Sequence, residues 1–330
     1  MQPMPLELTT YRHSNDLPPL PGTDTFHSAE LFRTYEATPG YRPLLVVAWE
    51  DGHPLGKMLG VIRRSVRLTP PAFIHRCEIY GTGEYFVPPS RQPALFATLL
   101  QQLTREALKH SFLIEFRNLE DPKFGYLPFK QNGYFPVNWL RVRNSLHEER
   151  SIESRFSPSR LRQIRKGLQN GAEVREACSP EETESFARML HHVYSFKIRR
   201  HFPSLRFFRE LERQFMERQQ SRIFVVTYRG RIIGGSACIY SGTTAYLWFS
   251  GGMRKTYALQ YPGILAVWAA LRDARQRGYR HLEYMDVGLP FRRHGYRDFV
   301  LRFGGKQIST RRWFRFRWEW LNRLLSKFYE

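Results

Sequence analysis

The sequence is poor in cysteine and has no residue spacing typical of a metal site. Cys77, Cys178 and Cys238 are odd in number, far apart and outside any C-x-x-C pair, which argues against disulfides, zinc and iron–sulfur clusters. His191-His192 and the other nine histidines have no partner carboxylate or thiol at ligand spacing. We therefore expect a reducing, cytoplasmic environment and no bound metal.

Long apolar runs and the common nucleotide-binding patterns are also missing. No window approaches the roughly eighteen uninterrupted apolar residues that span a bilayer. The segment from Met1 to Pro5 has no basic region followed by an apolar one, so no secretory signal is predicted. Without G-x-G-x-x-G or G-x-x-x-x-G-K-[ST], a Rossmann or P-loop nucleotide site is excluded. The 42% hydrophobic and 15% aromatic content nevertheless predicts a folded, soluble protein.

Acidic residues and lysine are both scarce relative to arginine. The 330 residues include 51 Lys and Arg against 30 Asp and Glu, a net charge of +21, and only nine of the basic residues are Lys. Arg presents a planar fork of donors that suits phosphate and carboxylate. The net positive charge favours an anionic partner such as a nucleotide, tRNA or a lipid headgroup. A cationic surface without a dedicated partner explains the same charge equally well.

What the sequence does contain is one order of elements used twice. The first half carries strands over 44–49, 55–66 and 112–116, a helix over 93–110 and a glycine turn at Asn132-Gly133. The second half carries strands over 223–228, 232–239 and 282–285, a helix over 262–277 and a glycine turn at His294-Gly295. The sequence separation between matching positions falls from 178 residues for Gly56 and Gly234 to 162 for Gly133 and Gly295. The two halves therefore differ in loop length but keep the same order of elements.

This repeat predicts two domains of one α/β (α+β) fold, each a mixed, mostly antiparallel twisted sheet flanked by helices. We expect an N-terminal domain over 1–145, a second domain over 146–310 and a basic aromatic C-terminal segment over 311–330. After the border, Ser157-Pro158 is typical of an N-cap followed by the first helical residue. Ser179 opens a capping box that predicts a further helix.

Three stretches of the second half resemble the FemABX-type, tandem-GNAT acyltransferases, with a BioF2-like acetyltransferase domain. They are 159–166 with 170–174, 230–235 with Tyr246, and 262–278 with 285–288 and 295–305. The resemblance covers roughly residues 150 to 308, and the first half joins it through the repeat. It implies two GNAT-like domains and transfer of an activated acyl group to an amine. The donor it implies is an acyl-CoA or an aminoacyl-tRNA.

Two departures from the family pattern concern this donor. The tRNA-dependent branch has G-x-x-x-F-K-x-x-F-G after its last glycine turn, and Val300 stands here in place of the lysine. The acetyl-CoA pyrophosphate pattern R/Q-x-x-G-x-G/A is not evident before Pro262. We favour acyl-CoA, with an aminoacyl-tRNA-dependent enzyme acting on a peptidoglycan precursor as the alternative. By the same motif, Phe299 and the neighbouring cation Arg302 are expected to bind substrate.

Direct attack by a neutral amine needs no covalent nucleophile, and no Ser-His-Asp or Cys-His arrangement is found. Asp286 follows a predicted buried strand, at a position where a family carboxylate would face a cleft and orient or deprotonate the amine. It is our candidate catalytic residue. Alternatively, Asp286 caps the next turn or pairs with Arg292 or Arg293.

Two basic groups are candidates for phosphate binding. Arg162, Arg165 and Lys166 share one helix face at i, i+3 and i, i+4, which suits either a phosphate clamp in a substrate site or a solvated basic face. Arg254 and Lys255 precede a helix start, where free N–H groups and the helix dipole favour an anion. With Tyr257 and Gly263 they make up the expected cofactor-binding segment.

The C-terminal segment mixes tryptophan, phenylalanine and leucine with arginine. Such a helix suits a membrane interface, and the alternative is a last strand from Trp313 to Trp318 followed by a helix docked on its domain. The expected partners are a phosphorylated small-molecule donor, tRNA, and the inner membrane face through 311–330, with the protein a monomer. A peptidoglycan precursor, a small amine and a lipid-linked amine all remain open as acceptors. The rival interpretation is a non-catalytic basic protein that binds RNA or a membrane surface.

Overall fold

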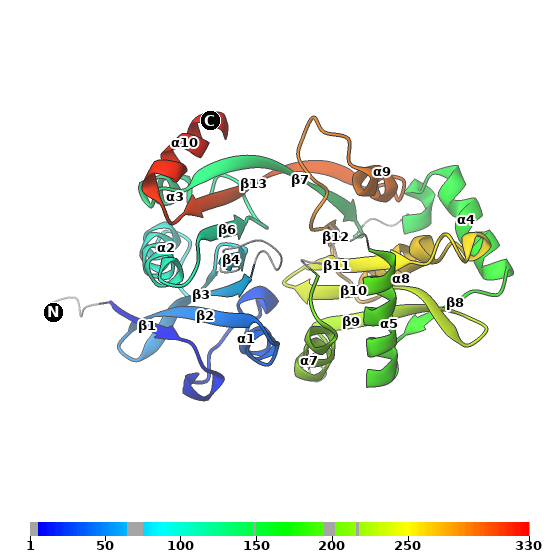
Figure 1. Ribbon diagram of the computed structural model, residues 1–330, viewed down its shortest axis with the longest axis horizontal. Helices are drawn as coiled ribbons and strands as arrows, with labels where there is room; N and C mark the ends of the chain where they lie inside the picture. Colours follow the sequence, from blue (N-terminus) through cyan, green and yellow to red (C-terminus); the bar gives the residue numbers. More distant parts are fainter. Residues whose placement is uncertain (1–5, 65–74, 148–149, 195–201, 216–217, 330) are drawn as a thin grey trace. The chain divides into compact units, whose positions relative to one another are not determined.

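The computed structural model describes residues 6–64, 75–147, 150–194, 202–215 and 218–329 (Figure 1). It divides into two compact units. Unit 1 comprises Met1–Trp139 and Ser309–Glu330, and unit 2 comprises Leu140–Ile308. The expected borders were residues 145 and 310. The observed borders, after Trp139 and after Ile308, each lie inside a long strand. Residues 311–330 likewise form part of unit 1 and are not a separate segment.

Unit 1 is a sheet with a helix on each face. Its elements are β1 (Glu7–Tyr11), α1 (Ala29–Glu36), β2 (Tyr41–Glu50), β3 (His53–Arg64), β4 (His75–Tyr80), β5 (Glu84–Tyr85), α2 (Gln92–Leu108), β6 (Leu113–Arg117), α3 (Tyr126–Gln131), the start of β7 (Phe135–Ser145), the end of β13 (Lys306–Phe316) and α10 (Glu319–Tyr329). The strand order is β1-β2-β3-β4-β6-β13, and β4 and β6 are parallel.

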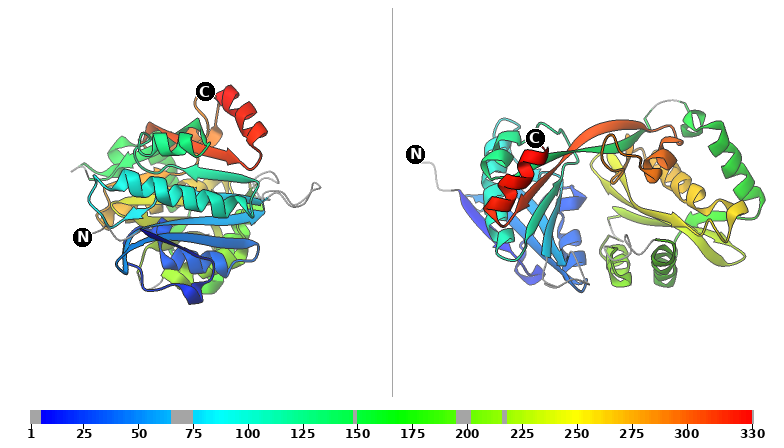
Figure 2. Two further views of the ribbon diagram at one scale, coloured as in Figure 1. Left: turned by 90° about the vertical axis from the view of Figure 1, so that its left-hand side faces the viewer. Right: turned by 45° about the horizontal axis from the view of Figure 1, so that its top comes forward.

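Strand alternation determines which faces of the sheet α1 and α2 cover. Leu44, Val46 and Ala48 of β2 belong to the core beneath α2. The intervening residues Leu45 and Val47 are equally buried and point to the other face, because successive strand side chains alternate. Helix α1 also packs on β2, so α1 and α2 lie on opposite faces of the sheet (Figure 2).

Unit 2 has the same layered plan. Its elements are the end of β7, α4 (Pro158–Gln169), β8 (Glu173–Glu176), α5 (Pro180–Val193), α7 (Leu205–Phe215), β9 (Ser221–Tyr228), β10 (Arg231–Ser241), β11 (Thr244–Gly252), α8 (Pro262–Gln276), β12 (His281–Tyr284), α9 (Gly295–Leu301) and the start of β13. The strand order is β7-β12-β11-β10-β9-β8, with β11 and β12 parallel. The predicted caps are confirmed: the Ser157 and Ser179 side chains accept hydrogen bonds from Arg160 N and Glu182 N.

The repeat is visible in the order of elements. The series β2-β3-β4-α2-β6-α3-β7 matches β9-β10-β11-α8-β12-α9-β13. One expected pairing is wrong, however. Gly133 follows α3, whereas Gly295 begins α9. The counterpart of Gly133 is Gly304, which follows α9, and the two have φ values of 75° and 78°.

The last strand of each repeat completes the sheet of the other unit. In unit 1, β13 of the second repeat pairs with β6. In unit 2, β7 of the first repeat pairs with β12. A matching buried ion pair accompanies each exchange, since Arg312 contacts Glu115 at 2.9 Å and Arg141 contacts Glu283.

Candidate active site

In unit 2 the parallel strand β12 ends while its partner β11 continues. Pairing between β11 and β12 runs from Thr244 opposite His281 to Leu247 opposite Tyr284, and β11 then continues to Gly252. In unit 1 the corresponding pairing reaches Tyr80 and Arg117, where both strands end. The part of β11 after Leu247, which extends past the end of β12, is therefore a feature of unit 2, and we take it as the centre of the candidate site.

Glycine occupies β10 and β11 at this extension, in the cross-strand pairs Gly234–Gly252 and Gly235–Gly251. A Cβ atom on Gly252 would lie 2.4 Å from the backbone nitrogen of Gly263, in the first turn of α8. On the other face, a Cβ on Gly235 would lie 2.7 Å from the Phe186 ring of α5. The missing side chains thus let both helices pack directly against the strands, and they place the start of α8 beside the end of β11.

Two tyrosines converge on Ser250, which lies on β11 beyond its last pair with β12. The Tyr194 hydroxyl donates to the Ser250 carbonyl oxygen at 2.6 Å, and the Tyr296 hydroxyl lies 3.3 Å from Ser250 Oγ. Burial raises the pKa of Tyr194 to about 12 and also raises the pKa of Tyr296 well above its ordinary value. Both phenols therefore keep their protons at neutral pH.

Asp286 is close to Tyr296 of this pair and, as expected, follows the strand. Strand β12 ends at Tyr284, and Asp286 is exposed in the loop that follows. Its negative charge is close enough to contribute to the raised pKa of Tyr296, after the larger effect of burial. The loop is held by the Arg297 guanidinium, which donates to the carbonyl oxygens of Leu289, at 2.8 Å, and Arg292.

The expected cofactor-binding residues lie together where β11 leads into α8. Arg254 and Lys255 are exposed in a turn, and Tyr257 donates its backbone N–H to Met253 O at 2.9 Å. Gly263 lies in the first turn of α8. Met253 also lines a cavity of about 510 Å³ against α5 and the turn between β9 and β10.

The residues of α4 divide into an exposed set and a buried one. Arg162, Arg165 and Lys166 are all exposed. Arg160 instead turns inward, where its guanidinium lies 4.4 Å from the centre of the Phe299 ring. Burial lowers the pKa of Arg160 to about 10.

The structure therefore shows Phe299 in a packing contact with Arg160, which the sequence motif did not indicate. Arg302, at the C-cap of α9, is exposed.

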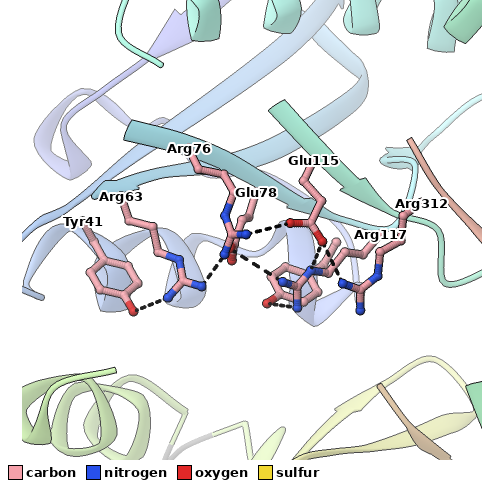
Figure 3. A network of polar contacts seen from close by, with 8 residues as sticks. Tyr41, Arg63, Arg76, Glu78, Glu115, Arg117 and Arg312 are labelled. Carbon is pink, nitrogen blue, oxygen red and sulfur yellow. Dashed lines mark hydrogen bonds and ion pairs between the residues drawn. The ribbon is translucent and has the colours of Figure 1, made fainter. Parts of the chain in front are cut away.

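A second polar cluster lies in unit 1. Glu78 and Glu115 are neighbours on the parallel strands β4 and β6 and are almost completely buried. Four guanidinium groups surround them, those of Arg63, Arg76, Arg117 and Arg312 (Figure 3). Burial alone would raise the pKa of Glu78, but Arg63, Arg117 and Arg76 outweigh it and hold that pKa far below its usual range.

Sequence reasoning missed both this cluster and the tyrosine pair. Arg76 and Glu78 alternate on β4, as do Glu115 and Arg117 on β6, and this alternation is a signal of one charged sheet face. No comparable signal marks Tyr296, because its neighbour Ser250 is 46 residues away in the sequence.

Within the described residues no group of three or more His, Cys, Asp or Glu side chains could hold a metal ion. No helix in the same part of the chain is both long and apolar enough to cross a membrane.

Comparison with known proteins gives a family match and a set of similar folds. Residues 158–293 match the family described as the acetyltransferase (GNAT) domain. The crystal structure of FemX is similar over 94% of this chain and 95% of its own, with a TM-score of 0.63 and 12% identity. None of the curated protein sequences compared with the chain matches it.

Two further solved structures have the same fold. A tandem GNAT protein from the clavulanic acid biosynthesis pathway is similar over 95% of this chain and 99% of its own, with a TM-score of 0.56 and 12% identity. L-PGS from Bacillus licheniformis is similar over 82% of this chain and 86% of its own, with a TM-score of 0.52 and 10% identity.

Proposed function

We propose that the chain is a FemABX-like N-acyltransferase whose donor, an acyl-CoA, binds in unit 2. The match of residues 158–293 to the acetyltransferase (GNAT) domain and the fold shared with FemX and the tandem GNAT protein support this proposal. The observation that carries this proposal is the extension of β11 past the end of β12, beside the start of α8. A strand that extends past its partner presents backbone N–H and C=O groups at its edge, and these can pair with the amide groups of an extended acyl-pantetheine chain.

The positive charges near this extension of β11 suit the phosphate groups of such a donor. Arg254 and Lys255 are exposed in the turn between β11 and α8, within reach of a pyrophosphate group that lies against the first turn of the helix. Arg162, Arg165 and Lys166 supply further exposed cations on α4, which packs against α8. We assign Arg254 and Lys255 to the phosphates of the donor. The exposed cations of α4 are assigned to an anionic part of the donor or the acceptor.

The proposed chemistry is direct transfer. The amine nitrogen attacks the thioester carbonyl, the new C–N bond forms, and the C–S bond breaks when the tetrahedral intermediate collapses. A free thiol has a pKa near 8.5, so the departing thiolate gains from a proton donor. We assign that role to the Tyr296 hydroxyl, which is protonated and adjacent to β11. Asp286 orients the amine and accepts the proton that it loses.

Aminoacyl-tRNA is the second candidate donor. The net charge of +21 and the fold shared with FemX favour it, whereas Val300 in place of the family lysine disfavours it. In that case the exposed cations of α4 contact the tRNA backbone.

The test is acyl transfer measured in parallel with a panel of acyl-CoA esters and charged tRNAs, on a panel of amines. Our proposal requires activity with a CoA ester, and the double variant Arg254→Ala/Lys255→Ala should raise KM for that ester more than it lowers kcat. Activity with charged tRNA and with none of the CoA esters would reverse the choice of donor.

A further inference from the structure

Among the described residues, the contacts that hold helix α10 on unit 1 lie on one side of the helix. The Asn322 side chain is 4% exposed, accepts a hydrogen bond from Phe316 N at 3.2 Å and donates to Gly133 O. Leu321 and Leu325 are half-buried on the same side. These contacts determine which face of the helix points away from the unit.

The outward face is apolar. Trp320, Leu324 and Phe328 are 63%, 48% and 76% exposed, and their spacing of four residues puts them in one line along the helix. Trp318, 53% exposed, stacks on Trp320 with 6.1 Å between ring centres. Large apolar side chains gathered in this way on a surface mark a contact site.

Positive charge runs beside this line. Arg323 and Lys327 follow Trp320 and Leu324 by three residues, which puts them on the adjoining strip of the helix, and both are exposed. Arg317, just before the helix, is exposed as well. Glu319 is the only acidic residue between 317 and 329, and its carboxylate lies 2.7 Å from Arg315.

We propose that α10 docks the protein onto an anionic lipid bilayer. The helix lies flat in the interface, with Trp318, Trp320, Leu324 and Phe328 at the boundary between headgroups and acyl chains. Arg317, Arg323 and Lys327 contact the lipid phosphates. The exposed apolar line and the adjoining basic strip together favour this occupant, because bilayer interfaces bind both parts at once. A protein partner would need no such charge, and an RNA would not require the apolar line.

The experiment is co-sedimentation of the full chain with vesicles of phosphatidylcholine alone and of phosphatidylcholine mixed equally with phosphatidylglycerol. We expect binding to the anionic vesicles, weakened by salt, with little binding to the neutral ones. The double variant Trp320→Ser/Phe328→Ser should lose at least about tenfold in affinity. Leu259→Ser is the matched control, because Leu259 is 65% exposed in unit 2, and it should bind as the parent protein does.

The role of the positive charge is tested with the double variant Arg323→Glu/Lys327→Glu. Its control is Arg229→Glu/Arg231→Glu, because these residues are exposed in unit 2 and the control changes the net charge by the same amount. The first pair should weaken binding at least about tenfold and the second much less. Equal binding to neutral and anionic vesicles, or α10 variants that bind like their controls, would overturn the proposal. So would an α10-dependent dimer in the absence of lipid, detected by light scattering, since it would show that a second copy covers the apolar line.

Discussion

The substitution Tyr296→Phe removes one hydroxyl from the candidate site and little else. Its ring keeps its packing against Tyr284, at 6.4 Å, and Phe299, at 6.2 Å. The lost polar contact is the one with Ser250 Oγ, so the free energy of unfolding should fall by only about 1 kcal/mol. If the hydroxyl protonates the departing thiolate, kcat should fall by about 10² to 10⁴-fold, the usual range for a positioned acid.

The assay is release of the thiol from a CoA ester and from the matching ester of an acidic thiophenol. The thiophenolate leaves without needing a proton, so the defect of the Phe variant should shrink with that donor. Because burial raises the pKa of Tyr296 well above 10, the rate of the parent protein should not fall near pH 10 through loss of this proton. Tyr194→Phe is the control, since its hydroxyl donates to a backbone carbonyl. An equal loss with both donors, or no loss with either, would refute the acid role.

Three further predictions concern the buried ionic cluster of unit 1 and the candidate site of unit 2. Glu115→Gln should lower the free energy of unfolding by about 3–5 kcal/mol, because it leaves buried guanidinium groups without their counter-charge. The pKa of Glu115 is lowered in the folded state, so its contribution should be complete above the unfolded pKa of about 4.3 and disappear as the pH falls below that value; urea unfolding from pH 7 to pH 3 measures this. Gly252→Ala should cost about 1–3 kcal/mol, since the new Cβ meets the backbone at Gly263, whereas Gly295→Ala meets nothing within 4 Å and should be neutral in thermal unfolding. Asp286→Asn should lose turnover with an unchanged Tm, and a lower Tm at normal turnover would remove Asp286 from the site.

Local patterns were sufficient to predict much of the fold. The caps Ser157 and Ser179 could be predicted because each depends on residues within one helical turn. The strands could be predicted from runs of apolar residues. The mistaken pairing of Gly133 with Gly295 has a local cause too. Each glycine is preceded by a polar residue and followed by tyrosine, and this similarity concealed the short helices that end at one and begin at the other.

The candidate site was less predictable because it depends on distant contacts. Arg254, Lys255, Tyr257 and Gly263 could be proposed from the sequence because they are neighbours at a predicted helix start, and their role remains a proposal. The position of Tyr296 beside Ser250 depends on how α9 packs near β11, and no spacing in the sequence encodes it. Arg160 likewise looked equivalent to its basic neighbours on α4, although it is the one that packs inward.

The exchange of last strands has a consequence for how the protein is made. Arg312 and Glu115, joined in unit 1, are 197 residues apart, so a nascent chain exposes the edge of β6 until almost all of it has been synthesised. Unit 1 therefore cannot complete its sheet before the second repeat has been synthesised. This long-range pairing predicts slow folding that depends on chaperones. A gene cut near codon 150 would yield two fragments, each retaining the strand that the other lacks. Such fragments should recover a folded protein only when they are produced together.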